Sequence, residues 1–145
     1  MKAVIQRVAN ASVTVDGEVK GSIESGFLIL LGVENGDNES EAKTLAAKIA
    51  GLRIFTDEND KMNLSIKDVK GKLLIVSQFT LYGDCSQGNR PSFIEAARPE
   101  EANPLYEYFC NQCELNNIEV QKGIFGADMK VELINDGPVT IIIEK

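Results

Sequence analysis

The longest apolar run of the chain occupies residues 27–33 and reads Phe-Leu-Ile-Leu-Leu-Gly-Val, directly after Gly26. A strand with one wet face alternates apolar and polar residues, whereas a strand covered on both faces is apolar at successive positions. This run therefore predicts a strand that is buried on both faces. Such a strand needs a layer of structure on each side, so the run also predicts a layered core.

The segments around this strand show two kinds of pattern. Residues 12–15 alternate with period two, and Asp16-Gly17 is a pair that tolerates positive φ in a tight turn, so residues 12–23 predict a β-hairpin. Residues 39–52 predict a helix, because Asn38 and a glutamate three residues on have the spacing of a capping box. A second helix is predicted from Asn103, with Pro104 at its first position. Further strands are predicted over residues 53–56, 72–78, 118–121, 129–134 and 139–143.

Many strands and only two substantial helices predict an α/β fold, with a single domain over residues 1–145. No internal repeat, low-complexity tract or linker-like stretch divides the chain. We expect two packed β-sheets in a barrel-like arrangement and two main helices that cover one side, which makes three layers. The order of the strands does not follow from the sequence pattern.

The composition excludes several classes of chemistry. The chain has 15 Lys and Arg against 22 Asp and Glu, a formal net charge of −7, which is opposite to the basic balance of a protein that coats nucleic acid. It has no His, which excludes a His-based triad, a His general base and His metal ligands. Three cysteines are too few for a disulfide scaffold, and no apolar run approaches the length of about 20 residues that spans a bilayer. We expect a cytoplasmic protein with reduced thiols, no metal and no membrane role.

Several local motifs have ordinary structural interpretations. Cys110-x-x-Cys113 has the spacing of half a zinc or redox site, but it lies in a predicted helix and has no second ligand pair. Cys85 lies in a polar loop without a His partner, so its thiolate fraction at neutral pH is expected to be small. The glycines at the two ends of residues 123–126 flank Phe125. They favour the presentation of its ring at a surface, where it can stack on a base.

Two segments place polar groups or backbone carbonyls at unusual points. The strand predicted over residues 72–78 leads into Ser77-Gln78-Phe79-Thr80, which delivers two hydroxyls, a carboxamide and an aromatic ring within four residues. Strand ends are common places for sites, but the two hydroxyls equally suit a strand-to-turn exit in which they satisfy backbone groups. Residues 136–140 read Asp-Gly-Pro-Val-Thr. A cis bond before the proline would aim two carbonyl oxygens in nearly the same direction, and a simple turn before the last strand is the alternative.

These two segments closely resemble the two signature motifs of the D-aminoacyl-tRNA deacylases, formerly called D-tyrosyl-tRNA deacylases. The first signature corresponds to residues 77–81, Ser-Gln-Phe-Thr-Leu, and the second to residues 137–140, Gly-Pro-Val-Thr. The likeness spans nearly the whole chain and includes residues 1–8, 61–65, 88–93 and 123–129. Each piece alone carries little weight, but together, in this order and at this total length, they are specific.

The resemblance implies an enzyme without a cofactor that hydrolyses the ester between a D-amino acid and the terminal adenosine of tRNA, and that also accepts glycyl-tRNA. It implies a homodimer in which a cis Gly137–Pro138 dipeptide reaches into the active site of the partner subunit. The carbonyl oxygens of this dipeptide would face the α-carbon of the amino acid and exclude an L side chain. Arg7 would support the dipeptide. The residues that we assign on this basis to substrate binding are Arg7, Phe125, Met129, Gly137, Pro138 and Thr140.

The resemblance assigns catalysis to the first signature, residues Ser77, Gln78, Phe79 and Thr80. Ser77 and Gln78 would organise a turn whose backbone N–H groups, around Phe79 and Thr80, stabilise the oxyanion. Phe79 would also hold the terminal nucleotide. A threonine hydroxyl with no base beside it stays protonated at neutral pH. We therefore expect attack by water, assisted by the ribose hydroxyl of the substrate, rather than by Thr80.

Two alternatives belong to other classes of function. The first is a dimeric module that binds a free RNA 3′ end or a nucleotide without cleaving it. The second is a thiol-dependent enzyme that uses Cys85. The acidic net charge suits a protein that grips only the acceptor end of tRNA, with phosphate contacts from Lys43, Lys48 or Arg53, although these side chains equally suit a solvated surface.

Overall fold

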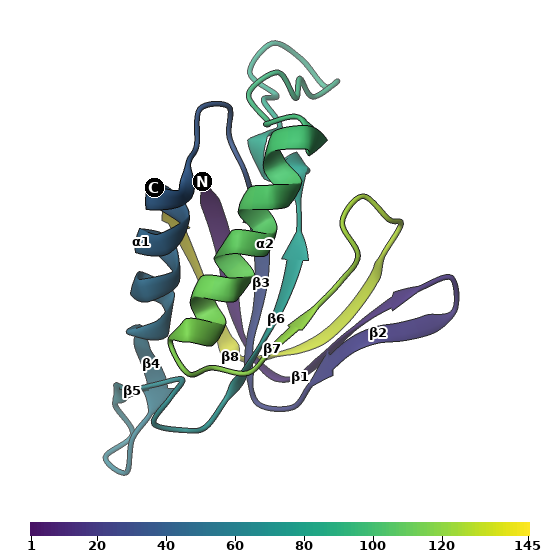
Figure 1. Cartoon of the computed structure of the whole chain (residues 1–145). Coiled ribbons are helices and arrows are strands. Elements are labelled where there is room, and N and C mark those ends of the chain that lie inside the picture. Colours follow the sequence, from purple (N-terminus) through teal and green to yellow (C-terminus); the bar gives the residue numbers. More distant parts are fainter.

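The apolar run of residues 27–33 forms β3 (Gly26–Gly32) in the computed structural model, which describes residues 1–145. Every residue of β3 except Leu30 is buried. β3 pairs antiparallel with β1 (Lys2–Val15) on one side and parallel with β6 (Lys72–Ser77) on the other (Figure 1). The prediction of a strand that is covered on both faces is confirmed.

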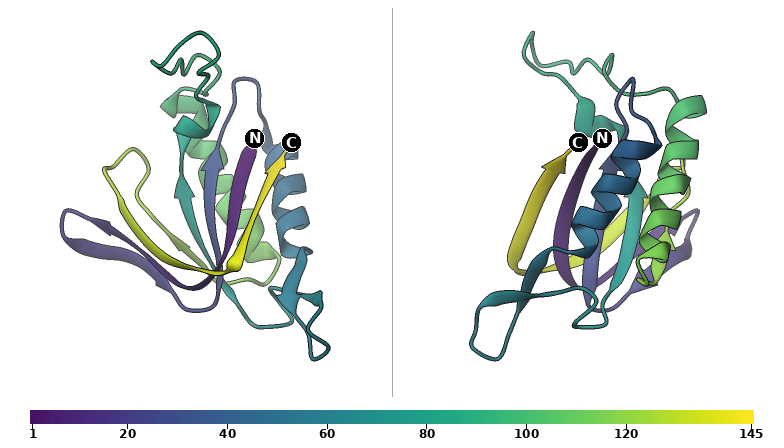
Figure 2. Two further views of the ribbon diagram at one scale, coloured as in Figure 1. Left: turned by 180° about the vertical axis from the view of Figure 1, so that it is seen from behind. Right: turned by 60° about the vertical axis from the view of Figure 1, so that its left-hand side comes forward.

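The main sheet has six strands in the order β2-β1-β3-β6-β7, and β8 pairs with the other side of β1. The outer strands are β2 (Glu18–Ile23), β7 (Val120–Lys122) and β8 (Lys130–Glu144). β1 and β8 bend strongly, so that the sheet folds over into a nearly closed, barrel-like form (Figure 2). One half of β1 lies between β3 and β8, and the other half lies between β2 and β8. The two packed sheets that the sequence predicts are therefore two halves of one bent sheet.

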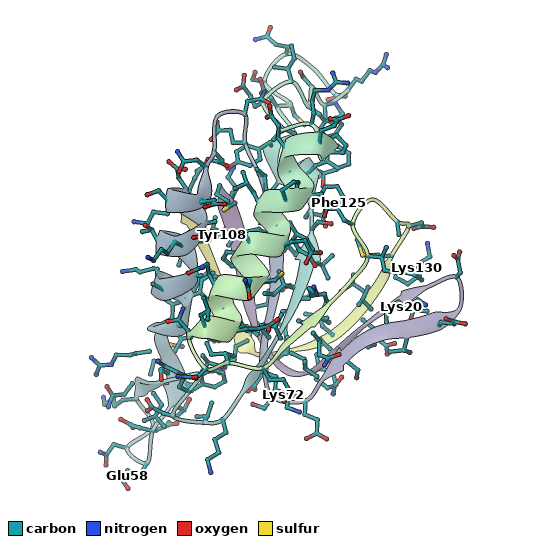
Figure 3. All side chains as sticks on the ribbon, viewed as in Figure 1. Lys20, Glu58, Lys72, Tyr108, Phe125 and Lys130 are labelled. Carbon is teal, nitrogen blue, oxygen red and sulfur yellow. The ribbon has the colours of Figure 1, made fainter.

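A small second sheet stands beside the main one. It consists of β4 (Arg53–Thr56) and β5 (Met62–Ser65), an antiparallel hairpin whose turn carries Glu58 out into solvent (Figure 3). Phe55 of this hairpin stacks on Phe27 of β3, with ring centroids 5.1 Å apart. That contact fixes the hairpin against the main sheet.

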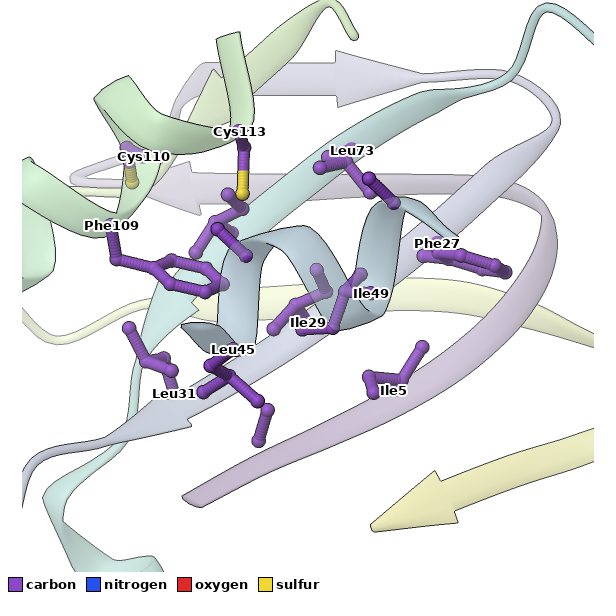
Figure 4. Packing of buried hydrophobic residues seen from close by; sticks show 14 of the residues in the cluster. Ile5, Phe27, Ile29, Leu31, Leu45, Ile49, Leu73, Phe109, Cys110 and Cys113 are labelled. Carbon is purple, nitrogen blue, oxygen red and sulfur yellow. The ribbon is translucent and has the colours of Figure 1, made fainter. Parts of the chain in front are cut away.

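Two helices, α1 (Glu39–Ala50) and α2 (Pro99–Leu115), lie side by side on one face of the sheet. The core between them and β3 contains Ile29 and Leu31 of β3, Leu45 and Ile49 of α1, and Phe109 of α2 (Figure 4). A second core fills the interior between the two halves of the sheet. It consists of Val8, Ala11, Val13, Ile23, Leu28, Leu74 and Val76. The helices and the two halves of the sheet are the three layers that the sequence predicts, and the α/β prediction is confirmed.

Two local predictions are confirmed in detail. Asp16 and Gly17 have φ of 51° and 79°, as the tight hairpin turn between β1 and β2 requires. The capping box of α1 is present. The Asn38 side chain accepts a hydrogen bond from the backbone N–H of Ser40 at 2.8 Å, and the Glu41 carboxylate accepts one from the N–H of Asn38 at 2.7 Å.

The predicted start of the second helix is wrong. α2 begins at Pro99, four residues before Asn103, and Pro104 lies inside it. Pro99 meets the requirement for the first helical position as well as Pro104 does, and two glutamates follow it in the first turn, where acidic side chains are favourable. The two strands predicted over residues 129–143 are joined in β8. Neither α1 nor α2 has the length and hydropathy that a bilayer-spanning helix requires.

Gly26 generates a prediction about stability, because it begins β3 directly opposite Lys72 of β6. A Cβ on Gly26 would lie 1.9 Å from the carbonyl oxygen of Lys72, so Gly26→Ala must push the two strands apart. We expect this variant to lower the free energy of unfolding, measured by urea denaturation, by about 3 kcal/mol or more. Gly51→Ala is the matched control, since a Cβ there meets nothing closer than 3.6 Å. The control is expected to change stability by less than about 1 kcal/mol. Equal losses in the two variants would contradict this account of the β3–β6 contact.

Candidate active site

A cavity of about 540 Å³ opens at the carboxyl end of β6. Its floor is formed by buried side chains of both cores, among them Leu31 of β3, Val76 of β6 and Tyr106 of α2. The loop before α2 and the loop between β7 and β8 provide its walls. The residues of the first signature and of these loops that line it include Ser77, Gln78, Phe79, Phe93, Phe125 and Met129.

The pairing of β3 with β6 fixes the position of the first signature. Because the two strands are parallel, their carboxyl ends lie at the same edge of the sheet. The N–H of Gln78 donates to the carbonyl oxygen of Leu31 at 2.8 Å, so the pairing extends one residue beyond β6. The chain then turns into the short 3₁₀ helix η1 (Phe79–Tyr82). Gly32 permits this close approach, since a Cβ there would lie 3.1 Å from the carbonyl oxygen of Gln78.

Aromatic rings occupy two levels of the cavity. Phe125 lies in the loop after β7, beside α2, with its ring centroid 6.0 Å from that of buried Tyr106 (Figure 3). Nearer the surface, Phe79 is 56% exposed and meets Phe93 edge to face with centroids 5.1 Å apart. The cavity therefore has one aromatic pair against its floor and a second pair on its rim.

Few titratable groups line the cavity. The hydroxyl of Tyr106 donates to the carbonyl oxygen of Ile75 at 2.7 Å, and burial raises the pKa of this phenol. Asp128 is the only carboxylate of the lining, and it is exposed. No three His, Cys, Asp or Glu side chains of the chain gather in positions that suit a metal ion. Apart from this carboxylate, the polar groups available to a substrate here are hydroxyls, one carboxamide and backbone N–H groups.

The four residues predicted to be catalytic lie together at the end of β6. Ser77, Gln78 and Phe79 line the cavity, whereas Thr80 is exposed beside it. The Gln78 side-chain amide donates to the Thr80 hydroxyl. The N–H groups of Phe79 and Thr80 belong to the first turn of η1, where a helix leaves its N–H groups without intrahelical partners. This turn presents backbone donors next to the cavity.

The second signature forms a bulge in β8. Gln6 of β1 pairs with Thr140, and Val8 pairs with Asn135, so residues 136–139 of β8 lie opposite Arg7 alone. The bulge contains the Gly137–Pro138 peptide bond, which is cis, and both residues are exposed. Bulges of this kind bend a strand and re-aim the groups that it carries.

Arg7 holds this bulge from the inside of the fold. The residue is only 8% exposed, and its guanidinium donates to the carbonyl oxygen of Asp136 at 3.1 Å and to that of Ile54 at 2.7 Å. The side-chain amide of Asn135 donates to the carbonyl oxygens of Arg7 at 2.9 Å and Val139 at 3.0 Å. Three of these hydrogen bonds hold the bulge against β1, and the bond to Ile54 links Arg7 to the β4–β5 hairpin.

The predicted substrate-binding residues thus fall into two separate groups. Phe125 and Met129 line the cavity, whereas Arg7, Gly137–Pro138 and Thr140 do not. The Thr140 hydroxyl instead lies 3.4 Å from oxygen Oδ1 of Asn135, beside the bulge. Within one chain, the two signatures do not form a common pocket.

Sequence reasoning missed three residues of these groups. Tyr106 has helical spacing to buried Phe109 and Cys113 in α2, but the sequence pattern assigns it no role. Phe93 lies in the segment 88–93, to which no site role was assigned. Asn135 has no local signal, because its role depends on the register between β1 and β8.

The three cysteines and the three candidate phosphate-binding residues lie outside the cavity. Cys85 is exposed and does not line it. Cys110 and Cys113 are buried in α2, and burial raises the pKa of both thiols, to about 12 for Cys110. Arg53 bonds to Asn63 across the β4–β5 hairpin. Lys43 and Lys48 are exposed on α1 and do not line the cavity.

A family model described as D-Tyr-tRNA(Tyr) deacylase matches residues 4–144. The chain belongs to this deacylase family. Relatives named D-aminoacyl-tRNA deacylase from Geotalea daltonii, Koribacter versatilis and Pelobacter propionicus are 63%, 60% and 59% identical. The matches cover 99%, 99% and 100% of this chain and 96%, 97% and 100% of those proteins. The resemblance seen in the sequence is confirmed, and the family to which the chain belongs is one of hydrolases.

Two solved structures extend the comparison to the fold. A protein named c-Myc DNA Unwinding Element Binding Protein superposes with a TM-score of 0.93 at 42% identity, covering 100% of this chain and 99% of that one. A probable eukaryotic D-amino acid tRNA deacylase superposes with a TM-score of 0.83 at 15% identity, covering 98% of this chain and 97% of that one. The second likeness shows the shared deacylase fold.

Proposed function

We propose that this member of the deacylase family hydrolyses the ester bond of D-aminoacyl-tRNA and of glycyl-tRNA, and spares L-aminoacyl-tRNA. The observation that carries the proposal is the separation of the two signatures. One lines a cavity, and the other forms an exposed bulge that does not line that cavity in its own chain. Hydrolysis and chiral choice are therefore assigned to different parts of the molecule.

The cavity suits the end of an aminoacyl-tRNA in size and lining. Its volume of about 540 Å³ lies in the range of ligand pockets, and its lining is mostly apolar. The terminal adenine lies against Phe125, and Met129 closes the wall beside it. The amino acid ester then lies near Ser77 and Gln78, where the first turn of η1 begins.

In the proposed reaction, water adds to the ester carbonyl and the 3′ oxygen of the ribose leaves with a proton. The backbone N–H groups of Phe79 and Thr80 donate to the oxyanion that forms. The lining contains neither a His nor a paired nucleophile and base. The vicinal ribose hydroxyl of the substrate therefore assists the proton transfer, and the protein contributes position and polarisation.

Chiral choice comes from the carbonyl oxygens of Gly137 and Pro138. A glycine is required at 137, since its φ is +129° and a Cβ would lie 2.8 Å from Val139 and 2.9 Å from the Arg7 guanidinium. Arg7 and Asn135 hold the surrounding backbone in place. Such oxygens exclude an L side chain by shape, whatever that side chain is. The same carbonyl oxygens leave room for many D-amino acids and also for glycine, which has no side chain.

The bulge acts on the cavity of a second copy of the chain. Gly137 and Pro138 are exposed and do not line the cavity of their own chain. β8 pairs only with β1, so its other edge is open, and Ile134 and Ile142 on this strand are 57% and 65% exposed. A homodimer that buries these side chains would also bring each bulge to its partner.

The proposal is tested with tRNA charged with D-tyrosine, L-tyrosine or glycine. We expect the protein to hydrolyse the D-tyrosyl and glycyl esters, and to leave the L-tyrosyl ester at least about a hundredfold longer-lived. Equal lifetimes of the D and L esters would refute the proposal. Binding of tRNA without hydrolysis of any ester would favour the nucleotide-binding module instead.

Thr80→Ala separates water attack from attack by the threonine hydroxyl. With water as the nucleophile, kcat for the D-tyrosyl ester is expected to fall by less than about tenfold, because the backbone N–H of residue 80 remains. Loss of a true nucleophile costs more than about 10⁴-fold in comparable enzymes. Single-turnover kinetics measure the change, and an unchanged thermal midpoint shows that the variant is folded. A loss of the larger size in a folded variant would assign the attack to Thr80.

A heterodimer tests whether the bulge acts on its partner. Gly137→Ala displaces the carbonyls in one subunit, and Phe79→Ala with Phe125→Ala disables the cavity of the other. If the bulge acts across the dimer, the intact cavity of the Gly137→Ala subunit faces the intact bulge of the other subunit. The purified heterodimer then hydrolyses the D ester and rejects the L ester. The Gly137→Ala homodimer lacks that selectivity. A heterodimer no more selective than this homodimer would place the bulge at its own chain's cavity and contradict the proposal.

A further inference from the structure

The rim of the cavity has exposed aromatic rings in addition to the pair against which the terminal adenine is placed. Phe125 and Tyr106 form a pair against the floor, where the proposed function seats the terminal adenine. Phe93 lies on the rim, 39% exposed, with its ring edge to face against Phe79. Ile94 beside it is 78% exposed. The rim therefore offers a second apolar platform that nothing in the chain covers.

The loop that carries this platform is held in place at several points. It spans residues 83–98 and projects beyond the end of the sheet (Figure 1). Asp84 and Ser92 exchange backbone hydrogen bonds of 2.8 and 2.9 Å across it, and the side-chain amide of Asn35 donates to the carbonyl oxygen of Ile94 at 2.8 Å. A further bridge joins Glu34 to Ala96. Phe93 is thus exposed on a fixed backbone, which is the arrangement expected of a binding surface.

The same loop carries an unpaired positive charge. Arg90 lies two residues before Ser92, is exposed, and has no acidic side chain within salt-bridge distance. In a chain of net charge −7, this loop combines an unpaired arginine with an exposed aromatic ring three residues further on. Base stacking on an aromatic ring with a basic group along the backbone is the usual mode of binding single-stranded nucleic acid.

We propose that residues 83–98 form a second nucleotide subsite. Phe93 stacks on the base that precedes the terminal adenosine, and Arg90 pairs with the phosphate that joins the two nucleotides. This inference rests on the proposed function and deepens it. Once the terminal adenosine is seated against Phe125, its 5′ phosphate must leave the cavity across the rim. The preceding nucleotide then meets the platform that the loop provides.

Two minimal substrates test the subsite, the D-tyrosyl ester of adenosine and the D-tyrosyl ester of the dinucleotide cytidylyl-adenosine. We expect kcat/KM of the native protein to be about tenfold higher for the dinucleotide ester, as one stacked base provides. Phe93→Leu keeps an apolar side chain but removes the ring, so the ratio of the two kcat/KM values is expected to fall toward one. Arg90→Gln is expected to lower the same ratio, and to reduce the slope of log kcat/KM against log salt for the dinucleotide by about 0.7.

Lys67→Gln is the matched control, because it removes the same charge from an exposed turn at the opposite end of β6 and is expected to leave the ratio unchanged. Hydrolysis of both esters with no advantage for the dinucleotide would overturn the subsite and leave the proposed function intact. An advantage that persists in both loop variants would overturn it as well. So would equal loss for the two esters in Phe93→Leu, since that ring would then only shape the cavity. Failure to hydrolyse either ester or D-tyrosyl-tRNA would remove the proposed function itself.

Discussion

Among the residues that the fold buries, Arg7 is the only one with a charged side chain, and its hydrogen bonds hold the second signature. A guanidinium stays charged in a protein, so it is stable inside only where acceptors surround it. Arg7 finds them in the carbonyl oxygens of Ile54 and Asp136, which belong to the β4–β5 hairpin and to the bulge of β8. One planar group therefore links three segments that are far apart in the sequence. The exposed Gly137–Pro138 dipeptide gains its fixed position from this internal bond rather than from contacts of its own.

At the cavity, the core supplies the floor, and the main chain of η1 supplies the donors that we assign to the oxyanion. The parallel pairing of β3 with β6 continues to the hydrogen bond between Gln78 and Leu31, so the first turn of η1 starts from a fixed point. The side chains around it provide shape and apolar surface. In the proposed mechanism both the oxyanion donors and the groups that exclude L-amino acids are backbone atoms. The sequence requirement is then for residues that hold the backbone, which explains why two short signatures carry so much of the resemblance.

Features that depend on neighbours in the sequence were predictable. The buried β3 strand, the Asp16-Gly17 turn and the Asn38 cap of α1 each follow from a local pattern that only one structure satisfies. The start of α2 was not predictable in this way, because Pro99 and Pro104 satisfy the same rule. The bulge opposite Arg7 depends on register between strands more than a hundred residues apart, and no local pattern encodes it. The entry of Phe93 and Tyr106 into the cavity was not predicted either, because it depends on how the loop before α2 and α2 itself pack against β6 and the β7–β8 loop.

The absence of His and of any paired base in the cavity suits the substrate that we propose. An aminoacyl ester already carries a reactive carbonyl and a neighbouring ribose hydroxyl, so little side-chain chemistry is needed. Each well-placed backbone donor to the oxyanion is worth roughly 2.7–4 kcal/mol, which supplies acceleration without a titratable group. For an enzyme that removes wrong esters, the decisive quantity is the difference between D and L substrates rather than the absolute rate. In the proposed mechanism, the partner's carbonyl oxygens supply this difference by excluding the L substrate in the binding step. The backbone donors that speed hydrolysis are then separate from the groups that select the substrate.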